Sequence, residues 1–131
     1  MDLAQRARDY LRTIEEARSF DEVAAFLHPE MVLVEHPNRL VVAGKTRRLD
    51  DVRQAFESGR RAISAQKYDT RTVLRDGSTV ALEVEWAGML AVPLGVLKPG
   101  ESMRCVSAMF LRFDAEGRIL RQDNYDCFPP F

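Results

Sequence analysis

The segment that decides the fold is residues 102–127, which reads SMRCVSAMFLRFDAEGRILRQDNYDC. Two strand-like runs, 102–113 and 118–127, flank Asp114-Ala115-Glu116-Gly117, and a short link ending in glycine is typical of a hairpin turn. The same period of two occupies residues 67–75 and 79–90 around Asp76-Gly77. The second half of the chain therefore predicts a four-stranded antiparallel meander.

The first half of the chain has the period of helices instead. Apolar residues recur at helical spacing over residues 2–18 and from Asp50 or Asp51 to about residue 65, which predicts two amphipathic helices. Asp2 is placed to cap the first of them. Between them, Ser19 and Glu22 have the spacing of a capping box and open a shorter helix. His28-Pro29-Glu30 is expected to end it, because the residue before a proline leaves the helical region. An apolar strand over residues 31–36 and a loop over residues 37–48 follow.

This order of elements predicts an α+β fold, with three N-terminal helices on one face of a mainly antiparallel sheet. The length of 131 residues suits one domain, residues 1–131. The strand at 102–113 is apolar on both sides, with Met109 on one face and Phe110 on the other. A second apolar face is usually covered, so we predict a homodimer packed through the outer face of the sheet.

Composition excludes several classes of function. The net charge of −1 gives no basic footprint for nucleic acid. No apolar run approaches the ~20 residues that span a bilayer, and the N-terminus has no signal-like apolar segment, so a cytoplasmic location is expected. Two distant histidines and two isolated cysteines, Cys105 and Cys127, predict free thiols and no metal site.

The stretch Val34-Glu35-His36-Pro37-Asn38 places an imidazole, a proline and an amide at the end of a predicted strand. A titratable side chain delivered there is a common way to build one wall of a small-molecule pocket. Two structural alternatives stay open. In the first, the His36 ring bonds a loop carbonyl and contacts no ligand. In the second, the Asn38 side chain forms an Asx-turn.

Four stretches of the chain together carry a resemblance to a known family: Phe20-Asp21-Glu22-Val23, Val34-Glu35-His36-Pro37, residues 113–119 and Asn124-Tyr125-Asp126. They resemble the nuclear-transport-factor-2-like superfamily, which includes ketosteroid isomerases, SnoaL-type polyketide cyclases and limonene epoxide hydrolase. The resemblance covers nearly the whole chain and implies a strongly bent sheet wrapped around the helices, with a pocket at the open end and no cofactor. The superfamily hosts many activities, so the fold names none of them.

The resemblance also implies roles for individual residues. His36 holds the place of the isomerase general base, and an imidazole titrating near ~6.5 can exchange protons at neutral pH. Tyr10 lies near the place of the isomerase tyrosine. Met109 holds the place of the protonated acid, and because a thioether cannot donate a hydrogen bond, standard ketosteroid isomerisation is not expected. Asn124 holds the place of the aspartate on the last strand of the cyclases.

Strand alternation decides which carboxylate of the last strand reaches the pocket. It places Asp126 with Gln122 and Asn124 on one face, and Asp123 with Tyr125 on the other, unless a β-bulge exchanges the faces. The candidate catalytic residues are therefore His36, Tyr10, Asn124 and Asp126. The candidate ligand-contacting residues are Asn38, Trp86, Met109, Gln122, Asp123 and Tyr125.

Three functions remain open. The first is a cofactor-independent isomerase, cyclase or hydrolase acting on a small, largely apolar carbonyl compound. The second is a non-catalytic module that binds a small hydrophobic molecule. The third is an interaction domain that uses only the outer sheet face, which requires a filled and closed cone.

Overall fold

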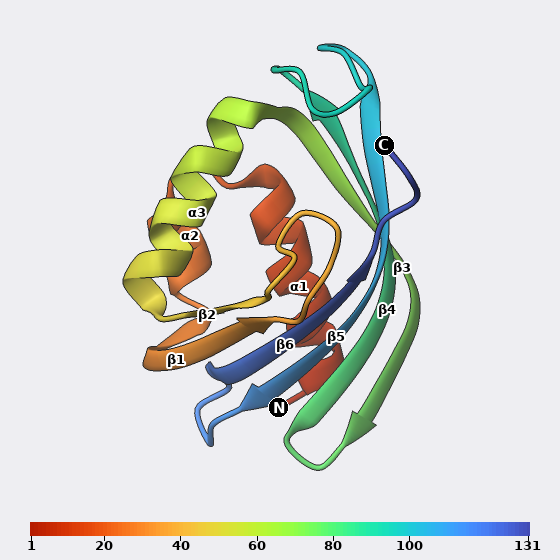
Figure 1. Cartoon of the computed structure of the whole chain (residues 1–131). Coiled ribbons are helices and arrows are strands. Elements are labelled where there is room, and N and C mark those ends of the chain that lie inside the picture. Colours follow the sequence, from red (N-terminus) through yellow and green to blue (C-terminus); the bar gives the residue numbers. More distant parts are fainter.

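The sheet and helices follow the predicted order in a computed structural model that describes all residues, 1–131 (Figure 1). The elements are α1 (Leu3–Glu16), α2 (Phe20–Ala24), β1 (Leu27–Glu35), β2 (Lys45–Arg47), α3 (Leu49–Ala62), β3 (Ile63–Asp76), β4 (Thr79–Leu90), β5 (Ser102–Phe113) and β6 (Ile119–Cys127). The α+β prediction is confirmed. Only two of the three predicted helices are long, since α2 has 5 residues.

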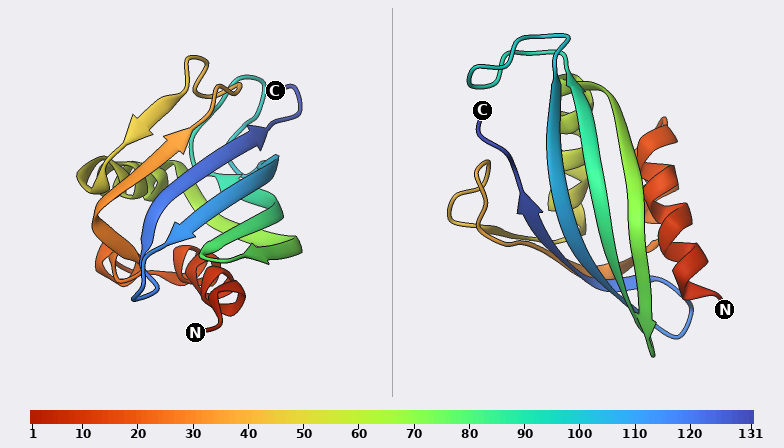
Figure 2. Two further views of the ribbon diagram at one scale, coloured as in Figure 1. Left: turned by 90° about the horizontal axis from the view of Figure 1, so that it is seen from below. Right: turned by 90° about the vertical axis from the view of Figure 1, so that its right-hand side faces the viewer.

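One six-stranded sheet has the order β2-β1-β6-β5-β4-β3. All neighbours are antiparallel except β1 and β6, which run parallel. The sheet is strongly bent, and the helices lie within its curve (Figure 2). We call the face toward the helices concave and the opposite face convex.

Side chains cap the helices as the sequence indicates. The Asp2 carboxylate accepts the Gln5 backbone N–H at 3.0 Å, which satisfies a free donor at the start of α1. The Glu22 carboxylate accepts the Ser19 backbone N–H at 3.2 Å, the return contact of the predicted capping box.

The segment His28-Pro29-Glu30 does not end a helix, because it lies inside β1, which begins at Leu27. A proline cannot donate to a strand ladder. Here the β1–β6 register shifts between Leu27 and Val32, so no regular ladder bond is required of Pro29. The strand β2, which lies within the predicted loop 37–48, was not foreseen.

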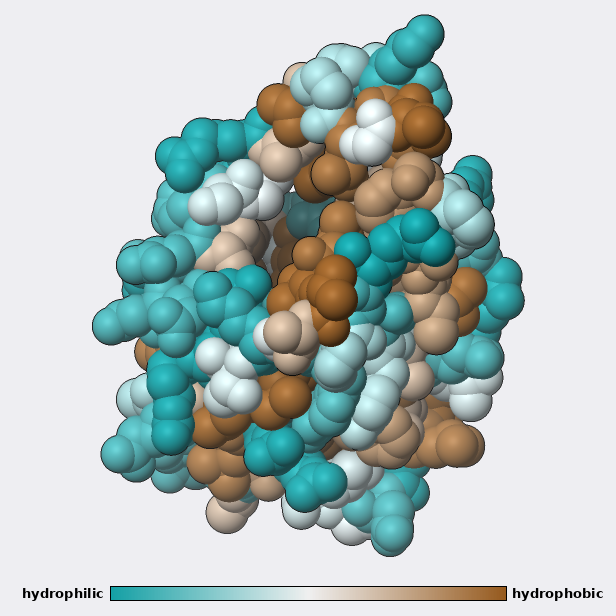
Figure 3. Space-filling model, viewed as in Figure 1, coloured by the Kyte–Doolittle hydropathy of each residue, from teal (hydrophilic) through white to brown (hydrophobic).

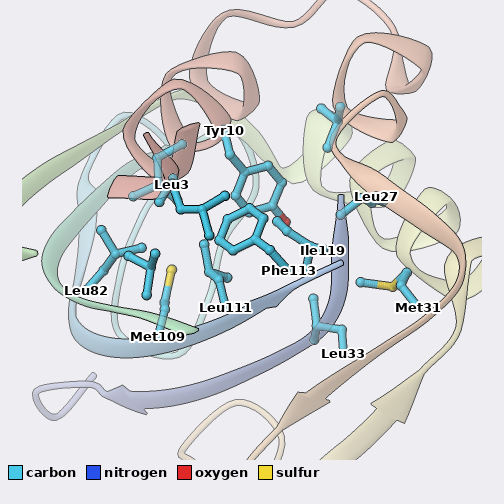
Figure 4. Packing of buried hydrophobic residues seen from close by; sticks show 14 of the residues in the cluster. Leu3, Tyr10, Leu27, Met31, Leu33, Leu82, Met109, Leu111, Phe113 and Ile119 are labelled. Carbon is cyan, nitrogen blue, oxygen red and sulfur yellow. The ribbon is translucent and has the colours of Figure 1, made fainter. Parts of the chain in front are cut away.

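The core lies on the concave face, toward the hairpins at residues 76–79 and 114–118. Side chains from α1, β1, β4, β5 and β6 meet there (Figure 4). The labelled members are Leu3, Tyr10, Leu27, Met31, Leu33, Leu82, Met109, Leu111, Phe113 and Ile119.

Packing is incomplete at the opposite end of the cone. The helix α3 has no fully buried residue, and its inward side chains, Leu49, Val52 and Phe56, are only partly covered. The space-filling view shows the surface hollowed between α3 and the sheet (Figure 3). This hollow argues against a cone closed by its own side chains. No helix is long and apolar enough to cross a membrane.

Candidate functional site

Strand β6 carries polar side chains on both faces of the sheet. Its pairing with β5 is uninterrupted from Arg121 to Cys127, and the only irregularity lies before it, at Arg112/Phe113. The simple alternation predicted for the last strand is therefore confirmed. Gln122, Asn124 and Asp126 face the concave side, where Gln122 and Asp126 bond α1 and β5 side chains, and Asp123 and Tyr125 face the convex side.

His36 lies on the convex face, which corrects the prediction that it lines the pocket. Its Nε2 atom is 3.0 Å from Asp123 Oδ1, and its ring stacks on Tyr125 with centroids 4.0 Å apart. The parallel pairing of Glu35 with Asn124 puts Glu35 on the concave face and turns the next side chain outward. His36 and Asp126 consequently lie on opposite sides of the sheet.

Asp123 belongs to the same convex cluster. Arg121 donates to both carboxylate oxygens, at 2.9 and 3.1 Å, and the Asp123 side chain is only 7% exposed. Hydrogen bonds from Arg121, and secondly from His36, hold the pKa of Asp123 below its usual value despite burial. Asp123 is thus an ionised, paired carboxylate remote from the cone.

Asn38 uses its side chain to close the loop after β1. Its Nδ2 donates to the His36 carbonyl at 3.0 Å, and its Oδ1 accepts the backbone N–H groups of Leu40 and Val41 at 2.8 and 2.9 Å. The Asx-turn alternative is the one that the structure shows. Gly44 closes the same loop at φ +71, where a Cβ would lie 2.8 Å from the Glu35 carbonyl oxygen.

A directed chain of hydrogen bonds runs across the concave face. The Tyr10 hydroxyl donates to Gln122 Oε1 at 2.7 Å, and Gln122 Nε2 donates to Asn124 Oδ1 at 3.0 Å. Burial raises the pKa of Tyr10, so the phenol keeps its proton and acts as a donor. Oδ1 of Asn124 accepts the last of these bonds, and its Nδ2 donates to no group of the protein. Tyr10 itself is 2% exposed and closed to a ligand.

Asp126 is the titratable group of the concave face. Its Oδ1 atom is 2.6 Å from Ser107 Oγ on β5, and its Oδ2 atom has no protein partner. Burial raises the pKa of Asp126 above its usual value, the Ser107 bond opposes that rise, and the negative charge of Glu35 adds to it. A carboxyl with a raised pKa can exchange a proton nearer neutral pH, which suits acid–base chemistry.

Sequence reasoning missed the ion pair between Glu35 and Arg47 on the same face. Arg47 donates to Glu35 Oε2 from Nε at 3.2 Å and from its terminal nitrogen at 3.1 Å. Residues 45–48 looked like solvated loop charge, yet β2 pairs with β1 and places Arg47 opposite Leu33. Alternation along β1 from Met31 and Leu33 to Glu35 was the available signal.

The remaining predicted residues divide between lining and core. Trp86 faces inward and donates from Nε1 to Gln66 Oε1 at 2.9 Å, and Gly88 leaves room for its indole ring. Met109 is 5% exposed within the core cluster, so it supports the cone and does not face a ligand. Burial raises the pKa of Cys105 to about 12, which makes this free thiol a poor nucleophile.

The predicted site residues do not form a metal centre and do not line the recess at the other end of the sheet. No group of three or more His, Cys, Asp or Glu side chains lies together in a way that could hold a metal ion. A recess of about 290 Å³ lies at the opposite end of the sheet, beside the N-terminus and the two hairpins, and is lined by Met1, Leu3, Arg75, Gly77, Ser78, Asp114, Ala115 and Gly117. None of the predicted site residues contacts it.

One family model matches most of the chain. The model of a family described as SnoaL-like domain matches residues 7–122. No curated protein matches the chain by sequence.

Solved structures share the fold at low identity. AclR of Streptomyces galilaeus, a proposed hydroxylase, has a TM-score of 0.79 and 12% identity over 98% of this chain and 81% of that one. IdmH of Streptomyces antibioticus, a proposed polyketide cyclase, has a TM-score of 0.79 and 11% identity over 96% and 92%. A ketosteroid-isomerase-like protein of Catenulispora acidiphila, in complex with trimethylamine, has a TM-score of 0.72 and 13% identity over 91% and 82%.

Proposed function

Because the chain belongs to the SnoaL-like domain family, we propose that it is a cofactor-independent acid–base catalyst acting on a small, largely apolar carbonyl compound. Two groups on the same face of β6 carry this proposal. The pKa of Asp126 is raised, and the amide N–H groups of Asn124 bond no protein group. Both lie on the concave face of β6 and are only partly buried. Asp126 takes the role first expected of His36.

The chemistry follows from these two groups. Ionised Asp126 removes a proton from the carbon next to the carbonyl, and the electron pair moves to the carbonyl oxygen. The Asn124 amide donates a hydrogen bond to that developing enolate, and a donor of this kind lowers the barrier. Asp126 then returns its proton to carbon. In an isomerase the proton returns to a different carbon. In a cyclase the enolate carbon instead bonds to a second carbonyl carbon of the compound, the electron pair of that C=O bond moves to its oxygen, and this oxygen takes the proton from Asp126.

Hydrogen exchange tests the proposal without knowledge of the natural substrate. The α-protons of 2-tetralone in D₂O can be followed by NMR with and without the protein. We expect exchange above the buffer rate, and a loss of about 10²–10⁴-fold in Asp126→Asn, the usual contribution of one placed acid–base group. His36→Ala is the matched control, because His36 lies on the other face, and should change the rate less than about threefold. Loss of exchange in His36→Ala with no loss in Asp126→Asn would show that His36, and not Asp126, transfers the proton.

A non-catalytic binding module is the second candidate. The amide of Asn124, which cannot exchange a proton, occupies the place of an acid in the related cyclases, and this favours simple binding. Under this alternative 2-tetralone binds, as shown by chemical-shift changes in the protein, but its α-protons exchange no faster than in buffer.

We also propose that two copies of the chain pair through the convex face. Phe110 and Tyr125 form an edge-to-face contact on that face, with ring centroids 6.0 Å apart, and both remain substantially exposed. Val106 and Leu120 extend the exposed apolar surface. Such a surface is usually covered in a soluble protein. Sedimentation should give the mass of a dimer, and Phe110→Glu should give a folded monomer. A monomeric wild-type chain at micromolar concentration would refute the pairing.

A further inference from the structure

Tyr68 differs from the other two tyrosines in the chain. The Tyr10 hydroxyl is bonded to Gln122, and Tyr125 lies on the convex face against His36. Tyr68 lies on β3 opposite Trp86, so both side chains point to the concave face. Its backbone N–H is bonded to the Glu15 carboxylate of α1, which fixes this part of β3 against the helix.

The Tyr68 hydroxyl has no hydrogen-bond partner in the protein. Every side-chain nitrogen or oxygen that is sealed from solvent in this chain does have one. The ring of Tyr68 packs against the core, yet its hydroxyl must therefore remain accessible. The hollow between α3 and the sheet is open on the same concave side. Polar groups beneath the surface of a protein are normally bonded, so a free phenol in this position calls for an explanation.

The electrostatic surroundings keep this phenol a donor. Burial is the main cause that raises the pKa of Tyr68, and the nearby Tyr10 and Asp126 side chains add to the rise. The hydroxyl is therefore protonated at neutral pH and can donate a hydrogen bond. Tyr68 and Asp126 lie on the same concave face, with β4 and β5 between their two strands in the bent sheet.

We propose that the Tyr68 hydroxyl is a ligand-binding group, which donates a hydrogen bond to the carbonyl oxygen of the bound compound. This inference rests on the proposed function and adds a second donor to the Asn124 amide. Two donors from different strands fix the position of one oxygen and so orient the carbon beside it toward Asp126. The expected ligand has one exposed oxygen acceptor on an apolar body. The apolar body would contact Trp86 and the half-buried side of α3.

A pair of probes isolates the hydrogen bond from the apolar contacts. 2-Acetylnaphthalene and 2-isopropenylnaphthalene have nearly the same shape, but only the first has an oxygen acceptor. In the wild-type chain we expect the ketone to bind more tightly than the alkene, by a factor of about three to ten for each of the two neutral hydrogen bonds. Tyr68→Phe, which removes one oxygen atom, should reduce that preference and leave the affinity for the alkene unchanged.

The carbonyl stretch of ¹³C-labelled 2-acetylnaphthalene supplies a direct readout. A hydrogen bond to the oxygen lowers this frequency, so the stretch should rise in Tyr68→Phe and stay constant in Tyr125→Phe, a control that removes a hydroxyl on the convex face. An unchanged preference and an unchanged stretch in Tyr68→Phe would overturn the role of Tyr68 while leaving the binding cone intact. Failure of both probes to bind the wild-type chain would overturn the proposed function and this inference together.

Discussion

The Ser107 hydroxyl lies 2.6 Å from Oδ1 of Asp126, and this single contact is the only hydrogen bond that the carboxyl makes with the protein. Three positions earlier on the same strand, Asp123 accepts bonds from both Arg121 and His36. The pKa is raised in the first aspartate and lowered in the second. One strand thus presents a carboxyl with a raised pKa on the concave face and an ion-paired carboxylate on the convex face.

Asp126→Asn should stabilise the protein at neutral pH. Since the pKa of Asp126 is raised by folding, the native state favours the protonated form, and its contribution to stability is present at low pH and lost as pH rises through the native pKa. An asparagine never ionises and avoids that loss. In thermal melts from pH 4 to pH 8, the melting temperature of the variant should increase relative to that of the wild type as pH rises. Equal melting temperatures across the range would show that the carboxyl is well solvated.

Asp123→Asn should act in the opposite direction. The pKa of Asp123 is lowered by folding, so its contribution is present above the unfolded pKa and is lost as pH falls through the native value. Replacing an ionised acceptor of Arg121 and His36 should cost about 1.5–3 kcal/mol at pH 7. Denaturant unfolding of both proteins at pH 7 and below pH 3 measures the difference, which should shrink at the acid end. A cost that persists unchanged there would point to a packing effect.

Much of this arrangement was predictable from local patterns. The alternation of Gln122, Asn124 and Asp126 along the last strand gave the correct face for each residue, because the β5–β6 pairing has no irregularity there. Asp2 and Glu22 cap the helices as their positions suggested.

The errors arose where long-range pairing decides the outcome. The face of His36 depends on the parallel register of β1 with β6, and residues 27–35 and 119–127 are far apart in the sequence. The motif Val34-Glu35-His36-Pro37 placed the imidazole at the right strand end but on the wrong side. The free hydroxyl of Tyr68 was equally invisible, since only the packed structure shows which phenol lacks a partner.

Gly88→Ala should disturb the wall of the cone. A Cβ at this position would lie 2.5 Å from two atoms of the Trp86 indole, so the ring must move. Overpacking of this kind costs about 1–3 kcal/mol. Trp86 is the only tryptophan, so its fluorescence reports the displacement directly, and we expect a red shift as the indole becomes more exposed.

Gly59→Ala is the matched control for that substitution. Gly59 lies in α3, where an added Cβ would meet no atom within 4 Å, so an alanine there should stabilise the helix by about 0.5–1 kcal/mol. Its tryptophan spectrum should not change. A stable Gly88→Ala protein with an unshifted spectrum would mean that the indole has room to rotate without loss.

Glu35→Gln should move the pH profile of the proposed reaction. The negative charge of Glu35 is one cause of the raised pKa of Asp126, so its removal should lower that pKa. Exchange of the 2-tetralone α-protons requires ionised Asp126, and its rate rises with pH through the pKa of this group. The rising limb of the plot of exchange rate against pH should therefore shift to lower pH in Glu35→Gln. Arg47→Gln leaves Glu35 in place without its ion-pair partner, and the limb should move the other way, to higher pH. Identical profiles for both variants and the wild type would show that Glu35 exerts no influence on the proton-transfer group.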